Sequence, residues 1–130
     1  MNIIPQELNW VERRVACTVA TVFNELRTGI ESDIAAINAT KPLSEQFSAN
    51  PLQSGMGIVI GQPRRVPNRR VLVALSDHNI EVRHEAKGTN WSAIVGLNNE
   101  GRCILRLEDG AELEQWQFRK RALEGLFFGD

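Results

Sequence analysis

The 130-residue sequence has no excess of charge and no long hydrophobic run, and each absence removes a class of function. Fifteen Lys and Arg residues stand against 16 Asp and Glu residues, which gives a formal net charge of −1 at pH 7. Such a chain has no overall attraction to nucleic acid or to an anionic membrane, so binding to either would need a local patch. The longest uncharged run, residues 46–63, is full of Pro, Gly, Asn and Gln, and the first residues lack the basic and apolar segments of a signal peptide. The sequence therefore predicts a cytoplasmic protein that does not span a membrane.

Cysteine and histidine are equally scarce, with two residues of each. Cys17 and Cys103 have no paired spacing, so they suggest neither a disulfide framework nor a zinc site, and a reducing compartment fits them. His78 and His84 lack the spacing of metal ligands. A nucleophilic cysteine paired with His84 is the catalytic alternative left open, although no local motif supports it. We therefore expect no metal and no cofactor, and we favour a non-catalytic role while an enzyme stays an open alternative.

Apolar residues recur at helical spacing over the first third of the chain. At about 100° per residue they fall in one stripe roughly 140° wide, which is typical of a helix with one buried face. Pro5 suits the first turn of a helix, and Pro42 marks the end of the pattern. The sequence therefore predicts one long helix over residues 5–39. The stripe comprises Leu8, Val11, Val15, Val19, Val22, Phe23, Leu26, Ile30, Ile34 and Ile37.

Strand spacing replaces helical spacing in the middle of the chain. Residues 56–108 alternate apolar and polar side chains in short runs separated by turn residues, which is typical of antiparallel strands. Residues 42–55 are predicted to form a loop, and residues 113–126 a C-terminal helix. The expected fold is a single α+β domain over residues 1–130: a long N-terminal helix packed on an antiparallel meander of four to five strands, with a short C-terminal helix.

The alternation of apolar residues predicts the register of two hairpins, because one register puts every apolar partner on the same face. The first turns at Asp77 and His78, and the second turns through a three-residue loop that places Gly101 in the left-handed position. The predicted pairs are Val71–His84, Val73–Val82 and Leu75–Ile80 in the first hairpin, and Ala93–Leu107, Val95–Leu105 and Leu97–Cys103 in the second. The run Met56 to Ile60 is expected at the edge of the sheet, where a partner strand could add.

A basic loop is the sharpest local feature of the sequence. Residues 41–76 carry five cations and one carboxylate, and four arginines of this stretch stand close together. They are Arg64, Arg65, Arg69 and Arg70. Such a loop could clamp phosphates of a nucleic acid or of an acidic partner. The alternative is a solvated loop whose arginines pair with Glu81, Glu85 or Glu112.

The back of the predicted long helix is poor in charge for a face that should be solvated. Trp10 and Cys17 lie there, and the C-terminal Phe127 and Phe128 form a second apolar group. A large apolar residue outside the buried stripe indicates an interaction surface, most simply with a second copy in a homodimer. The alternative is that Phe127 and Phe128 cover Trp10 within the same chain.

A pocket between helix and sheet is the remaining candidate site. His84, Trp91 and Trp116 are its expected lining, and a cavity with these groups converging would favour a ligand binder or an enzyme. No motif here identifies a family. The first hypothesis is accordingly a non-catalytic interaction or assembly domain that binds itself or another protein, followed by nucleic-acid or phosphate binding through the basic loop, and then by a ligand pocket.

Overall fold

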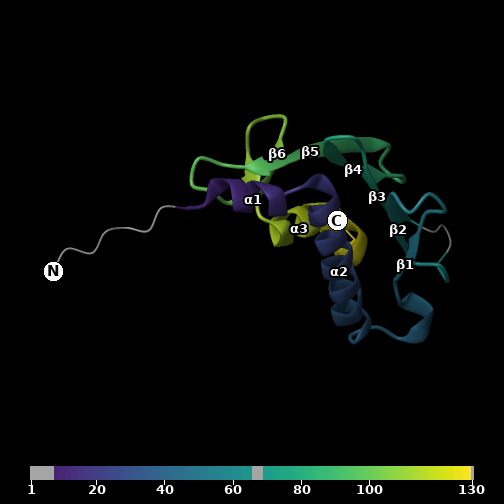
Figure 1. Cartoon of the computed structure of the whole chain (residues 1–130). Coiled ribbons are helices and arrows are strands. Elements are labelled where there is room, and N and C mark those ends of the chain that lie inside the picture. The colour runs from purple at the N-terminus through teal and green to yellow at the C-terminus, as the bar shows by residue number, and fades with distance from the viewer. Residues whose placement is uncertain (1–7, 66–68, 130) are drawn as a thin grey trace.

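The computed structural model describes residues 8–65 and 69–129, and its main feature is a curved antiparallel sheet with two helices packed against one face (Figure 1). The sheet has seven strands, and each strand pairs with the next along the chain. The α+β class and the antiparallel meander are therefore confirmed, with more strands than the four to five expected. The strands are β1 (Ser48–Pro51), β2 (Gly57–Gly61), β3 (Arg70–Leu75), β4 (Asn79–His84), β5 (Thr89–Leu97), β6 (Cys103–Leu107) and β7 (Glu112–Leu113).

Two helices, α1 (Trp10–Ala16) and α2 (Val19–Asn38), replace the single N-terminal helix that the apolar stripe predicts. The backbone leaves the helical conformation at Cys17 and Thr18. The side-chain oxygen of Thr18 then accepts a hydrogen bond from a backbone N–H in the first turn of α2, which is the usual role of a threonine N-cap. The prediction of one continuous helix over residues 5–39 is wrong because this cap starts a new helix, and its predicted start lies outside the described residues.

Other expected boundaries move as well. The loop predicted over residues 42–55 contains a 3-10 turn, η1 (Leu43–Glu45), and the edge strand β1, so that prediction is wrong. The meander therefore begins before residue 56 and continues past residue 108 to β7. The C-terminal helix, α3, spans Gln115–Phe128, because a capping box at Glu114 sets its first turn. It is shifted from the predicted 113–126 but is the same element.

The core lies between the sheet and the two longer helices. α2 buries six apolar side chains along one stripe, and α3 adds Phe118, Ala122 and Leu123. Each fully buried aliphatic side chain of this kind stabilises the fold by about 1.5–3 kcal/mol relative to an exposed one. The stripe residues of α2 that are buried are Val22, Phe23, Leu26, Ile30, Ile34 and Ile37.

Both predicted hairpins are confirmed in register. In the first, Val73 lies opposite Val82, and in the second Val95 lies opposite Leu105, as the alternation of apolar residues requires. Gly101 has φ of +78°, the left-handed conformation that the three-residue loop needs. Next along the sheet, Val82 lies opposite Trp91, so that Trp91 shares the core-facing side of the sheet with His84.

The two longer helices approach closely at Gly29. A Cβ atom at this position would lie 2.6 Å from Nη1 of Arg119, so any larger residue would displace the guanidinium from its present position. Nε of Arg119 in turn lies 2.8 Å from the carboxylate of Asp33, in an ion pair that joins α3 to α2. Gly29 thus leaves space for the Arg119 side chain where α3 packs against α2.

Candidate functional site

The short helix α1 exposes its apolar side chains. None of its seven residues is buried, and Trp10 and Val15 are 67% and 70% exposed. Val11 is exposed as well. The helix lies near the β5–β6 hairpin, where a Cβ atom at Gly101 would come within 2.7 Å of Leu8 Cδ1. A helix that buries nothing in its own fold, yet carries large apolar residues, is typical of a contact surface.

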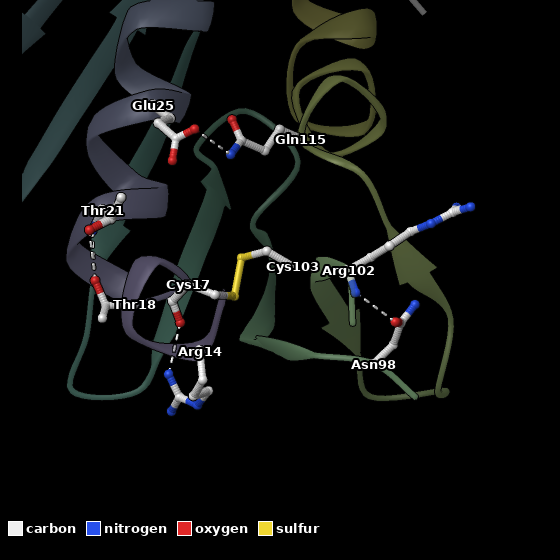
Figure 2. Close-up of a disulfide and its surroundings, with 9 residues drawn as sticks. All are labelled: Arg14, Cys17, Thr18, Thr21, Glu25, Asn98, Arg102, Cys103 and Gln115. Carbon is white, nitrogen blue, oxygen red and sulfur yellow. Dashed lines mark hydrogen bonds between the residues drawn. A yellow bond between two sulfur atoms is a disulfide. The ribbon is translucent and has the colours of Figure 1, made fainter. Parts of the chain in front are cut away.

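A disulfide holds the end of this helix against the sheet. Figure 2 shows Cys17, in the turn between α1 and α2, bonded to Cys103 at the start of β6. The Cα atoms of the two residues are 5.5 Å apart. Cys17 is only 1% exposed, and Nη1 of Arg14 donates to its carbonyl oxygen at 2.8 Å. The expectation of two unpaired thiols is wrong, and the redox argument for a cytoplasmic location falls with it. A thiol paired in this way also cannot act as the nucleophile that the sequence left open.

The sequence signal that could have exposed this pairing is Thr18. Once a helix begins at Thr18, Cys17 no longer lies on the back of a long helix but in a turn, where its side chain can point toward the sheet. Cys103 pairs with Leu97 as the alternation predicts, but at the start of β6 it is exposed and not buried in the core. Its expected role as a small hydrophobe is replaced by the covalent link.

The four residues of the predicted interaction surface are not brought together. Trp10 is exposed, whereas Cys17 is buried in the disulfide. Phe127 packs on Phe47, with ring centroids 4.9 Å apart, and Phe128 is exposed at the end of α3. The alternative in which the C-terminal phenylalanines cover Trp10 is therefore wrong, because the indole stays open to solvent.

His84 and Trp91 do converge. They line a cleft of about 610 Å³ between α3 and the strands β3, β4 and β5, at the start of β3 and the end of β4. Nε1 of Trp91 donates to Nε2 of His84 at 3.0 Å. Trp116, the third predicted pocket residue, is 53% exposed elsewhere on α3 and donates to the carboxylate of Glu114. Two of the three predicted lining residues thus share one cleft. The residue that sequence reasoning missed is Arg121, whose guanidinium carbon lies 5.2 Å from the centre of the Trp91 ring.

The environment of His84 fixes its protonation. Partial burial, and then the positive charge of Lys87, lower the pKa of His84 below its usual value, so the ring is neutral at neutral pH. Because Nε2 accepts from Trp91, the neutral ring carries its proton on Nδ1. Among the described residues no group accepts a hydrogen bond from Nδ1, so this donor is available to a ligand.

The basic loop joins this cleft. Arg69 and Arg70 line it, and Arg65 lines a second cleft that shares Arg69 and the end of α3. Arg70 also pairs with Glu85 at 2.8 Å, which is one of the pairings that the alternative interpretation expected. Arg64 is exposed, and the loop's residues 66–68 lie outside the described residues. Two candidate sites that the sequence treated separately therefore meet in one place.

The predicted open edge at Met56 to Ile60 is covered. β1 pairs with β2 along its whole length, so β2 is an inner strand and the edge belongs to β1. The expectation of an exposed edge there is wrong, because the preceding loop folds back as a strand.

Comparison with known proteins finds no relative of this chain. No family model matches it, and the curated proteins and the solved structures give no match. None of the helices in the described ranges is long and apolar enough to cross a membrane. Across residues 8–65 and 69–129, no three His, Cys, Asp or Glu residues come close enough together to hold a metal ion.

Proposed function

We propose that this protein is a non-catalytic assembly domain that uses α1 to bind a second copy of itself. The observation that carries the proposal is that α1 buries none of its own residues while it presents Trp10, Val11 and Val15 to solvent. Covering such side chains removes apolar area from water, and each square ångström removed contributes about 25 cal/mol.

The disulfide favours binding through α1 because it holds the helix in a fixed position. A helix of seven residues is marginal in isolation, but the link from Cys17 to Cys103 fixes its C-terminal end to the sheet. Holding the helix in place before binding lowers the entropy that association must overcome. The helix carries two arginines, Arg13 and Arg14, against one carboxylate, Glu12, so the like charge that two copies bring together is small and exposed to solvent.

The same disulfide bears on where the protein works. Disulfides persist in oxidising compartments and are rare in the reducing cytosol. The paired state of Cys17 and Cys103 supports an oxidising compartment in place of the cytoplasmic location that the sequence predicts. Rapid alkylation of the protein in cells, followed by mass analysis, distinguishes the two: unmodified cysteines support the proposal, and alkylated cysteines contradict it.

Sedimentation equilibrium of the purified protein tests self-association. We expect a dimer that the double substitution Trp10→Ser, Val15→Ser converts to a monomer. The midpoint of unfolding should change little at concentrations where both proteins are monomeric. Leu43→Ser is the matched control, because Leu43 is also exposed but lies beyond the opposite end of α2. A monomeric wild-type protein at high micromolar concentration, or equal loss in the control, contradicts the proposal.

A further inference from the structure

The cleft at His84 and Trp91 gathers positive charge, although Arg121 also lines a neighbouring recess that contains Glu81, Glu108 and Asp109. Arg69, Lys87 and Arg121 line it, and within the described residues none of them has an ion-pair partner. The cleft's described lining contains no Asp or Glu. Three unpaired cations around one recess repel each other, so an anion in the recess would relieve that repulsion.

Helix packing alone does not account for this cluster. The C-terminal end of α3 also lies at the cleft, since Gly125 and Gly129 line it, and helix ends of this kind attract cations. The partial charge there is only about half an elementary charge. One cation would balance this partial charge, whereas the cleft has three cations that lack an ion-pair partner among the described residues.

Arg121 and His84 are held in place before any ligand arrives. Arg121 lies over one side of Trp91, and Phe118 packs against the same ring with centroids 5.0 Å apart. Trp91 in turn orients His84, whose Nδ1–H remains free to donate. A preorganised set of donors binds an anion more tightly than mobile side chains do.

The shape of the cleft indicates the size and kind of ligand. Its volume of about 610 Å³ falls within the range of small-molecule sites, roughly 300–1,000 Å³. Val71, Ala86 and Leu126 give it an apolar wall beside the charged groups. Stacking of nucleic-acid bases has no free platform here, because the Trp91 ring is already in contact with Arg121 and Phe118.

We propose that this cleft is a binding site for a small organic phosphate, with Arg69, Lys87 and Arg121 around the phosphate group and the apolar wall against its organic part. His84 adds a neutral hydrogen-bond donor to the phosphate. This site is separate from the exposed face of α1, and it does not depend on self-association.

Titration of the 15N-labelled protein with phenyl phosphate, followed by NMR at constant ionic strength, tests this site. We expect saturable shifts of the Trp91 indole N–H and of backbone amides around residues 84–91 and 121–126. Arg121→Gln should weaken binding about tenfold, the loss of one charge-assisted hydrogen bond. Lys87→Gln, which removes no contact to a ring, should also weaken it, so the result does not depend on one variant folding correctly.

Arg102→Gln is the matched control, because Arg102 is an exposed arginine on the β5–β6 hairpin outside the cleft. Unchanged binding in this control supports the proposal. Shifts that do not saturate, or equal weakening in the control, overturn it. Binding of a single-stranded oligonucleotide without binding of phenyl phosphate overturns it in favour of a nucleic-acid backbone. Equal affinity for phenyl phosphate and inorganic phosphate overturns the role given to the apolar wall.

Discussion

The helices α1 and α2 share one apolar stripe in the sequence but have opposite fates in the structure. α2 buries six residues of the stripe, whereas Val11 and Val15, which continue it in α1, are exposed. The stripe is equally regular in both helices. Helical spacing therefore shows that a face is apolar, and it does not show what covers that face.

The difference arises where the chain turns. α2 contacts strands on both sides of the sheet's centre, and α3 packs beside it. On the other side of the break at Cys17 and Thr18, α1 instead lies beside the β5–β6 hairpin, near the loop that contains Gly101. α2 is held by burial of its side chains, and α1 is held largely by a covalent bond.

Removing that bond should have the largest effect on stability. The double variant Cys17→Ser, Cys103→Ser opens a loop that joins residues 86 positions apart. Chain entropy alone then predicts a loss of about 4–5 kcal/mol in the free energy of unfolding. Urea denaturation measures the loss, and the wild-type protein with reducing agent serves as the control. Hydrogen exchange should speed up in α1 before α2, and unchanged protection of α1 would contradict its dependence on the disulfide.

A pair of truncations compares burial in the two helices directly. Leu26→Ala in α2 should lower the free energy of unfolding by about 2–5 kcal/mol, because the side chain is 0% exposed and its removal leaves a cavity. Val15→Ala in α1 should change it by less than about 0.5 kcal/mol, since the side chain is exposed. Denaturant titration of both variants at a concentration where the protein is monomeric gives the answer. Similar losses would mean that α1 is buried in the folded chain.

The cap that separates the two helices should contribute less to the free energy of unfolding. Thr18→Ala removes the side-chain acceptor that caps α2, at a cost of about 1 kcal/mol. Thr18→Ser keeps the acceptor and is expected to restore most of the stability. Thermal unfolding compares the three proteins, and equal stability of the alanine and serine variants would show that the cap is not what starts α2.

The smallest expected effect is a pH dependence of the stability, caused by His84 in β4. The lowered pKa of His84 means that the folded protein binds this proton less readily than the unfolded chain. Stability from this group is therefore complete above about pH 6.5 and is lost as the pH falls from there through the lower pKa of the folded state. His84→Gln should remove this part of the pH dependence, measured by denaturation from pH 8 to pH 5. His78→Gln, in an exposed turn, is the control.

Local patterns account for what the sequence predicted correctly. The register of each hairpin depends on a few alternating residues and one turn, and both lie within a short stretch of chain. The buried face of α2 follows from the same kind of local spacing. β1 was missed because Ser48–Pro51 has no apolar alternation, and its pairing with β2 alone makes it a strand.

The candidate sites show the complementary limit. His84 and Trp91 share one cleft because both lie on one face of adjacent strands, whereas Trp116, predicted with them, lies elsewhere on α3. Arg121 was missed because its place over Trp91 depends on how α3 packs across the sheet. The disulfide was missed for the same reason, since Cys17 and Cys103 meet only when the whole meander between them has formed.

The bond between Cys17 and Cys103 also makes residues 17–103 a covalently closed ring. That ring contains α2, the strands β1–β5 and the exposed arginines Arg64 and Arg65. A single cut by trypsin at Arg65 would therefore leave the two fragments joined. The nicked protein would have the mass of the intact chain plus one water molecule until a reducing agent separated it into pieces.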